Sequence, residues 1–292
     1  VSTTDVLPHT TAAAPEVACT PADVSAADSG YAASKAVGEC LVAAAARRGD
    51  VTALIARLGM VAACARTGSG NETDFVSRLL VGVAAARAFP QTEARHTMVQ
   101  SVPVDVTAAA LCDLYETLRG GGGASGAVVH VVSGAPPQPM AALREVLLAF
   151  GPPFDALPLV PYAEWMRRVR LEAQLSLWPV MAWAEKLEEF PTFNRRGARL
   201  GACCEHVRPA TAAALRRGVD DEALHRALRV LFATSGTLRW DALRAHHRRL
   251  SGVSGASAVL SAVRVARRRA AMRNSLILVV AMLAAVYVRR RL

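Results

Sequence analysis

Two short apolar segments limit what this chain can fold into. Val51–Leu58 and Val128–Val132 are rich in β-branched residues and too short for good helices, so each is predicted to be a strand buried on both faces. A predicted helix at Tyr31–Arg48 precedes the first strand, and another at Asp105–Leu118 lies between the two. Helix and strand therefore alternate, as in an α/β fold with a parallel sheet.

The predicted helix at Tyr31–Arg48 has clear end signals. Ser29 can cap its amino end, arginines occupy its last turn, and Gly49 can end it. Its apolar residues recur at helical spacing, at Val37, Leu41, Val42 and Ala45.

Tyr31 and Lys35 form the most informative short motif. Only two of the 34 basic residues are lysines, and one of them follows a tyrosine by four positions. Residues i and i+4 share a helix face, so the phenol and the ammonium are expected side by side. A nearby cation makes a phenol proton easier to donate, which suits protonation of an oxyanion formed when hydride adds to a carbonyl. An aromatic residue beside a solvated lysine is the alternative.

The positive charge is confined to one end of the chain. Residues 239–292 contain twelve arginines and one acid, Asp241, a net charge of +11, so the total of +10 leaves −1 for residues 1–238. A neutral body without a basic stripe argues against nucleic acid as a partner.

Residues 275–288 form an uncharged run of fourteen residues with arginines on both sides. As a helix it would be about 21 Å long, shorter than the hydrocarbon core of about 30 Å. Snorkelling arginines or a thinned bilayer would still allow it to span, or it would lie in the interface. We therefore expect a membrane-associated carboxyl-terminal helix with the catalytic domain in the cytoplasm; a buried core helix is the alternative.

Six scattered cysteines show no zinc-ligand spacing. They are interpreted as reduced, mostly buried residues of a cytosolic protein, with no metal site. A redox pair at Cys203 and Cys204 is the alternative, although adjacent cysteines bridge only with strain.

A formal Gly-x-Gly-x-x-Gly occurs at Gly121, Gly123 and Gly126. A dinucleotide fingerprint needs a strand before it and a helix after it. Here the predicted order is helix before and strand after, so the segment is interpreted as a flexible loop.

The second half of the chain has a different character. Residues 135–163 are rich in proline, and helices are expected at Tyr162–Leu175, Trp178–Phe190 and Asp220–Ala233. We interpret this region as a mainly helical substrate-side lobe built after the sheet.

Tyr-x-x-x-Lys on a helix, followed by a strand ending Arg57-Leu58-Gly59, resembles the extended short-chain dehydrogenase/reductases, which have a Rossmann-like fold. Within that class, residues 57–80 resemble the thioester reductase domains that end carboxylic acid reductases, aminoadipate reductases and some nonribosomal peptide and polyketide synthases. The resemblance covers residues 1–238. Four later segments follow the order of that family, at Pro103–Val106, Val129–Val132, Pro161–Trp165 and Ala233–Leu238.

The resemblance implies roles for particular residues. Thr3, or Ser2 or Thr4 in its place, would supply a catalytic hydroxyl at a strand end. Tyr31 would protonate the substrate oxygen, and Lys35 would bind the nicotinamide ribose. The backbone around Leu58, Gly59 and Met60 would face the nicotinamide, although the family usually has proline where Leu58 stands. Asn71 and Asp74 lie in the family's substrate-side segment, where a helix cap is an equally good interpretation.

The resemblance also implies a reaction. NADPH would reduce an acyl thioester on a carrier protein's phosphopantetheine arm, giving a hemithioacetal that collapses to an aldehyde, sometimes reduced further to an alcohol. The glycine-rich strand, turn and helix that cradle the pyrophosphate do not occur in the sequence. We therefore expect a partial domain at residues 1–238 with an exposed sheet edge, inactive alone, and an arginine-rich tail at 239–292. The alternatives are another extended reductase or epimerase, a fatty acyl-CoA reductase, and a non-catalytic membrane-anchored remnant.

Overall fold

The computed structural model describes eleven parts of the chain, namely residues 1–7, 14–27, 29–72, 74–91, 101–121, 123, 125–136, 140–151, 154, 156–172 and 202–234. The helix expected at Trp178–Phe190 and the apolar run 275–288 lie outside the described residues, so both stay predictions. No helix within the described part combines the length and apolar character needed to cross a membrane.

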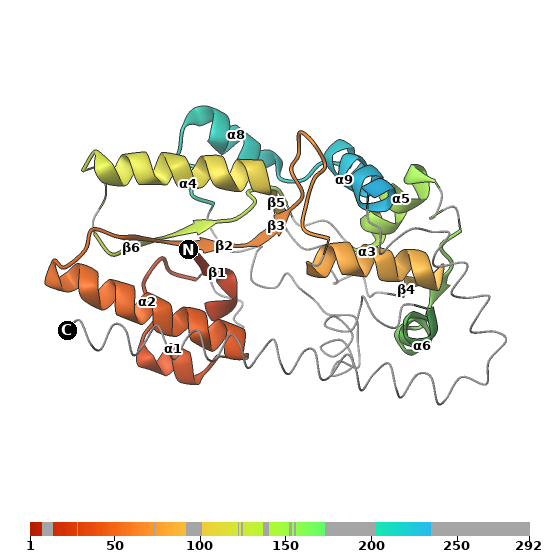
Figure 1. The fold of residues 1–292 in the computed structure, drawn as a ribbon, viewed down its shortest axis with the longest axis horizontal. Coiled ribbons are helices and arrows are strands. Elements are labelled where there is room, and N and C mark those ends of the chain that lie inside the picture. The colour runs from red at the N-terminus through yellow and green to blue at the C-terminus, as the bar shows by residue number, and fades with distance from the viewer. Residues whose placement is uncertain are drawn as a thin grey trace.

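Helices and strands alternate along the described residues (Figure 1). The strands are β1 (Ser2–Thr3), β2 (Leu54–Leu58), β3 (Met60–Ala62), β4 (Phe89–Pro90), β5 (Ser101–Pro103), β6 (Ala127–Val131) and β7 (Leu159–Val160). The helices are η1 (Thr4–Val6, a 3₁₀ turn), α1 (Pro21–Ser25), α2 (Gly30–Arg48), α3 (Phe75–Ala86), α4 (Val104–Arg119), α5 (Met140–Phe150), α6 (Tyr162–Glu172), α8 (Pro209–Arg217) and α9 (Asp221–Thr234).

The central sheet has three parallel strands in the order β1-β2-β6. Leu54 lies opposite Ala127 and Leu58 opposite Val131, while Thr3 lies opposite Leu58 on the other side. Two further parallel pairs join β3 to β5 and β4 to β7. The predicted parallel α/β class is confirmed, with strands slightly shifted from the predicted bounds. Among the described strands, β1 is paired on one side only.

The central sheet is covered by α4 on one face and by α2 on the other (Figure 1). Because successive strand residues point to opposite faces, Ala56 and Val129 pack with Leu114 of α4, whereas Ile55 and Val128 pack with α2. Each face of β2 and β6 is therefore covered by a helix, which explains why both strands are almost wholly buried.

Helix α2 turns its alanines, not its larger apolar residues, toward the sheet. The side chain of Ser29 accepts a hydrogen bond from Ala32 N at 3.1 Å, and Gly49 ends the helix with φ of 80°, so both end signals are confirmed. The buried residues are Ala32, Ala36, Glu39, Ala43 and Ala46. Leu41 is 67% exposed, and Val37 and Val42 are also exposed. The small side chains let α2 approach the sheet closely.

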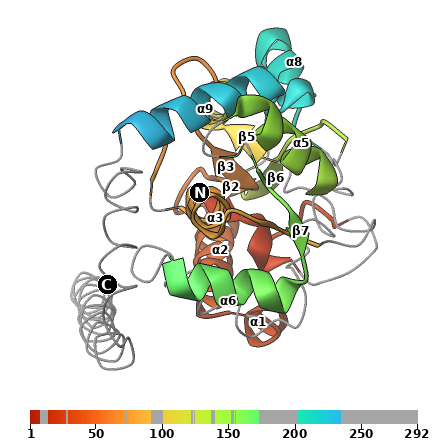
Figure 2. The same cartoon turned by 90° about the vertical axis from the view of Figure 1, so that its right-hand side faces the viewer.

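The second lobe packs α3, α5, α6 and α9 around β4 and β7. Figure 2 looks onto this lobe, with α9 and α5 above α3 and with α6 below it. Leu147, Phe154 and Leu228 are fully buried in its core, and Trp165 Nε1 donates to Ala88 O at 3.1 Å. The predicted helical lobe exists, but it does not simply follow the sheet, because α3 and β4 precede α4 and β6 in the chain.

A loop after β3 connects the two lobes. Ala65 N donates to Asp105 Oδ1 of α4 at 3.0 Å, and Ala65 O accepts a hydrogen bond from Arg226 of α9. Gly68 lies in the same loop with φ of 76°. A methyl group there would overlap the carbonyl oxygen of Arg226 and lie 2.7 Å from its carbon. Only glycine therefore allows this loop to lie against α9.

The glycine-rich segment is interpreted as a loop because of the order of the elements around it. The segment with Gly121, Gly123 and Gly126 follows α4 and precedes β6, in the predicted order.

All six cysteines are free. Cys19 and Cys203 are buried, Cys112 is exposed and the other three are partly buried, so burial is less general than the sequence suggested.

Gly68→Ala is expected to destabilise the protein by about 2–4 kcal/mol, because the left-handed backbone and the overlap with Arg226 both carry a cost. Gly121→Ala is the matched control, with φ of 75° and no neighbouring atom within 4 Å of the added methyl. It should lose only about 1–2 kcal/mol. Urea unfolding measures both, and equal losses would contradict the proposed contact.

Candidate active site

The candidate site residues lie where the parallel strands end. Thr3 ends β1 and Leu58 ends the adjacent β2, with Gly59 and Met60 directly after it. Five residues join the last turn of α2 to the start of β2, and α2 runs back along the sheet (Figure 1). Its first turn, which carries Tyr31, therefore lies toward the carboxyl ends of the strands. Ligands of open α/β sheets bind at that edge.

Tyr31 and Lys35 share a face of α2, as the spacing predicts. Lys35 Nζ lies 5.9 Å from the centroid of the Tyr31 ring, at the outer limit of a cation–π contact. Tyr31 is 55% exposed, so its hydroxyl can be reached from solvent. The Ser34 hydroxyl donates to the backbone carbonyl oxygen of Tyr31 at 2.8 Å, a bond that does not involve the phenol.

Thr3 is the buried hydroxyl at the end of β1. Its Oγ1 accepts a hydrogen bond from Asp5 N at 3.3 Å and caps η1. A hydroxyl that accepts one bond still has its own proton to donate. Ser2 precedes Thr3 and lies near Glu39, but its oxygen has no hydrogen-bond partner of good geometry among the described residues. Thr4 lies within η1.

Gly59 is held close to β6. Its N–H donates to Val131 O at 3.1 Å, and a methyl group on Gly59 would lie 3.2 Å from Val132 Cγ1. Leu58 pairs with both Thr3 and Val131, and its side chain packs on the α4 side of the sheet. Leucine therefore fits this strand end although the family usually has proline there.

The substrate-side residue Asp74 has a structural role. Its Oδ1 accepts a hydrogen bond from Ser77 N at 2.7 Å and caps α3. The helix-cap interpretation of Asp74 is therefore confirmed. Asn71 O accepts from Asp74 N at 3.2 Å in the turn before the helix.

A buried ion pair beneath the site was not recognised from sequence. Arg57 of β2 is 1% exposed and Glu39 of α2 is 3% exposed. Arg57 Nε donates to Glu39 Oε1 at 2.9 Å, and Nη2 donates to Oε2 at 2.7 Å. Two parallel charge-assisted bonds of this kind are strong and directional. The available signals were an arginine within an apolar strand and a glutamate one turn after Lys35.

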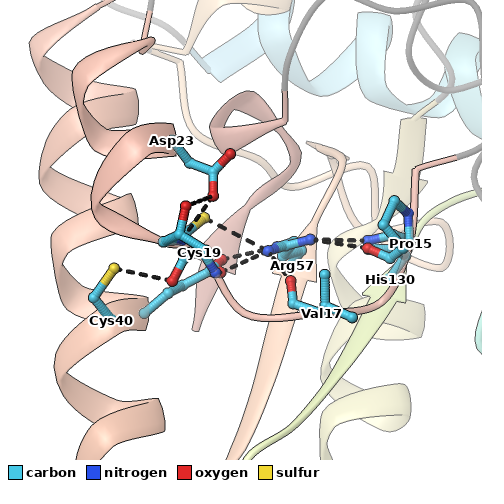
Figure 3. Close-up of polar contacts among 9 residues, drawn as sticks. Pro15, Val17, Cys19, Asp23, Cys40, Arg57 and His130 are labelled. Atoms are coloured by element: carbon cyan, nitrogen blue, oxygen red, sulfur yellow. Dashed lines mark hydrogen bonds and ion pairs between the residues drawn. The ribbon is translucent and has the colours of Figure 1, made fainter.

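The same arginine holds the segment that precedes α1 (Figure 3). Arg57 Nη2 donates to Val17 O at 2.7 Å and Nη1 donates to Pro15 O at 3.5 Å. On the carboxylate side, Cys19 N donates to Glu39 Oε2 at 3.2 Å. Residues 15–19, which lie between Thr3 and Tyr31 in the chain, are thus fixed by both members of the pair.

His130 of β6 completes this polar network. Its Nε2 lies 3.4 Å from Arg57 Nη1, and its backbone N–H donates to Glu16 Oε1 at 2.7 Å. Because an arginine only donates, Nε2 accepts and the ring proton is assigned to Nδ1. Burial and the charge of Arg57 lower the pKa of His130, although Glu16 and Glu39 oppose this.

Burial and nearby charges shift the pKa values of Glu39 and Cys19 in opposite directions. Burial alone would raise the pKa of Glu39, but the hydrogen bonds and charge of Arg57 outweigh it, so the pKa of Glu39 is lowered. Burial, together with the Glu39 carboxylate, raises the pKa of Cys19 to about 12. Cys19 is therefore an inert thiol, and Glu39 stays charged.

Comparisons with known proteins agree with this fold. Residues 2–111 match the model of an NAD-binding family described as male sterility protein. The structure is similar to the terminal R domain from the myxalamid PKS-NRPS biosynthetic pathway, with a TM-score of 0.60 and 27% identity, covering 82% of this chain and 58% of that one.

Two further relatives have related descriptions. The reductase domain of a nonribosomal peptide synthetase from Mycobacterium tuberculosis shares the fold, with a TM-score of 0.53 and 20% identity, covering 78% of this chain and 58% of that one. The adenylate-forming reductase Nps10 from Heterobasidion annosum is 28% identical over 149 residues, which are 51% of this chain and 12% of that protein.

The fold and these matches make the chain similar to NAD(P)-dependent reductase domains with an α/β Rossmann-like fold. The similarity extends to reductase domains of PKS-NRPS and nonribosomal peptide synthetase systems and to an adenylate-forming reductase. The chain spans 58% of the length of the two reductase domains that it resembles and 12% of Nps10.

The stability of the protein is expected to fall as the pH drops below about 6.5. The unfolded chain then takes up a proton at His130, whose pKa is lowered from 6.5 in the folded protein. For one such proton the slope is at most about 1.4 kcal/mol per pH unit. Below about 4.5 the lowered pKa of Glu39 adds a second loss in the same direction.

His130→Gln should flatten this dependence between pH 6.5 and 5, because glutamine does not titrate and can still accept from Arg57. Urea unfolding at several pH values measures the slope, with His206→Gln, at an exposed histidine, as control. A His130→Gln slope equal to that of the unmodified protein would contradict the assignment.

Proposed function

We propose that the protein reduces an acyl thioester, carried on the phosphopantetheine arm of a carrier protein, to an aldehyde with NADPH. The observation that carries the proposal is the pairing of Tyr31 with Lys35 on a helix that begins at the carboxyl edge of the sheet. An exposed phenol beside an ammonium is suited to donate a proton in a reduction of a carbonyl.

The residues present fit a nicotinamide cofactor. When bound, NADPH supplies the hydride. Lys35 and Tyr31 would bind its ribose, and the backbone of Leu58, Gly59 and Met60 would line the nicotinamide. A methyl group on Gly59 would lie 3.2 Å from Val132 Cγ1, so the glycine lets the strand end lie close to Val132 beneath the proposed cofactor position.

Thr3 and Tyr31 would act on the substrate oxygen. Both hydroxyls would donate hydrogen bonds to the thioester carbonyl, and Tyr31 would deliver its proton as negative charge develops on that oxygen. The Lys35 ammonium, 5.9 Å from the ring centroid, would stabilise the phenolate that remains. The resulting hemithioacetal collapses to the aldehyde and the free thiol of the carrier arm. A second reduction of the aldehyde would give the alcohol.

The carrier-bound substrate is favoured by the relatives. Two of the similar structures are described as reductase domains of PKS-NRPS or nonribosomal peptide synthetase systems, and Nps10 is described as an adenylate-forming reductase. Acyl-CoA would present the same thioester and the same phosphopantetheine arm. Turnover with carrier-bound and CoA-bound forms of one acyl group therefore distinguishes a carrier-linked enzyme from a fatty acyl-CoA reductase.

Tyr31→Phe in the full-length protein should lower kcat by about 10²- to 10⁴-fold, because the proton donor is lost. Binding of NADPH, measured by fluorescence titration, should weaken at most a few-fold, about what one lost hydrogen bond to the ribose costs, because Lys35 remains. Tyr115→Phe is the matched control, since Tyr115 is also exposed and has Arg119, four residues on, at 5.9 Å from its ring. Unchanged aldehyde formation by Tyr31→Phe would refute the proposal.

We further propose that residues 275–288 attach the protein to a membrane, supported by their apolar sequence between arginines. The full-length protein should float with vesicles that contain anionic lipid. Leu278→Arg, which interrupts the apolar run, should abolish flotation, whereas Leu238→Arg should not. Flotation of the Leu278→Arg variant would argue against this attachment.

A further inference from the structure

Glu39 and Arg57 link the two elements that carry most of the proposed site. Glu39 lies one helical turn after Lys35 on α2, and Arg57 directly precedes Leu58 on β2. Their two hydrogen bonds, at 2.9 and 2.7 Å, therefore join the helix of the proton donor to the strand end that would face the nicotinamide. Both side chains are buried and neither is exposed at the site itself.

The pair also fixes the chain between the two catalytic hydroxyls. Arg57 donates to the carbonyl oxygens of Val17 and Pro15, and Glu39 accepts from Cys19 N. The five residues from 15 to 19 lie on the path from Thr3 to Tyr31. Strand, helix and connecting segment thus converge on one guanidinium and one carboxylate (Figure 3).

The apolar contacts between α2 and the sheet fix the position of the helix less precisely than the ion pair does. The buried face of α2 consists of alanines apart from Glu39. Alanine has little side-chain volume with which to interlock against neighbours, so packing alone defines the position of α2 along the strands poorly. A bidentate arginine–carboxylate pair has a defined direction and separation.

We propose that Glu39 and Arg57 are positioning residues, which set the placement of Tyr31 and Lys35 relative to Thr3 and Gly59. This inference rests on the proposed reduction. It assigns the pair a role in rate, beyond a role in stability. Buried ion pairs often add little net stability, and well-packed apolar residues of similar size can replace them without loss. Stability and positioning can therefore be separated by experiment.

The test is the double variant Glu39→Leu/Arg57→Met in the full-length protein. Removing both charges avoids an unpaired buried charge, but Cys19 N and Val17 O lose their partners, so we expect a lower unfolding midpoint in urea with a transition that is still cooperative. The kcat for NADPH-dependent aldehyde formation should fall on the order of 100-fold, the loss that a displacement of about 1 Å can cause. Unchanged kcat in a folded double variant would overturn the inference.

Asp113→Asn provides a matched control. Asp113 is buried and paired with Arg208, but this pair joins α4 to α8 on the opposite face of the sheet. Loss of its charge should leave kcat unchanged. A fall in kcat as large as that of the double variant would mean that loss of any buried charged group affects the rate, and would also overturn the inference.

Arg57→Lys serves as the second variant if the double variant does not fold. Lysine keeps the charge but cannot form the forked contact with Glu39 or reach Val17 and Pro15 at the same time. We expect a lower kcat and faster hydrogen exchange in residues 16–19. In the unmodified protein the amide of Cys19 should be protected, and rapid exchange there would overturn the inference without any variant.

The two proposals fail in different ways. If Tyr31→Phe retains turnover, the proposed reduction is wrong. If Tyr31→Phe loses turnover but the folded Glu39 and Arg57 variants keep it, only the positioning role is wrong.

Discussion

The geometry of the candidate site depends on one charged contact that is removed from water. Arg57 and Glu39 each have most of their hydrogen-bonding capacity satisfied inside the protein, by each other, by backbone groups of residues 15–19 and by His130. An isolated buried charge would be costly. The two charges are tolerated only while every part of this network is in place, so the strand, the helix and the connecting segment are held together as a unit.

This network lies on the α2 side of the sheet, where the apolar side chains of the core are mostly small. The α2 side of the sheet buries alanines and a few residues such as Val6, Leu7 and Val132, whereas the second lobe buries Phe154, Leu147 and Trp165. Apolar contact scales with buried area and has no direction, but hydrogen bonds to a planar guanidinium do. The protein thus uses apolar burial to hold the second lobe together and directional polar contacts beneath the candidate site.

Local signals in the sequence predicted a large part of this arrangement. The apolar runs became β2 and β6, Ser29 and Gly49 bound α2, and the four-residue spacing brought Lys35 to the ring of Tyr31. Each of these features depends on residues close together in the chain. The buried face of α2 was not predictable in this way, because its alanines carry a weak hydrophobic pattern while Leu41 and Val42 suggested another face. The contact between Glu39 and Arg57 joins residues eighteen positions apart in two elements. No pattern among neighbouring residues predicts such a contact.

The second lobe is interleaved with the sheet along the chain. Its helix α3 is made before α4 and β6, but it packs against α6 and shares a core with Leu228 of α9 near the far end of the described chain. During synthesis the core around α3 is completed only when α9, well over a hundred residues further along the chain, has left the ribosome. Assembly of this lobe is thus a late, long-range event, and newly made chains are most exposed to aggregation and to chaperone binding at α3.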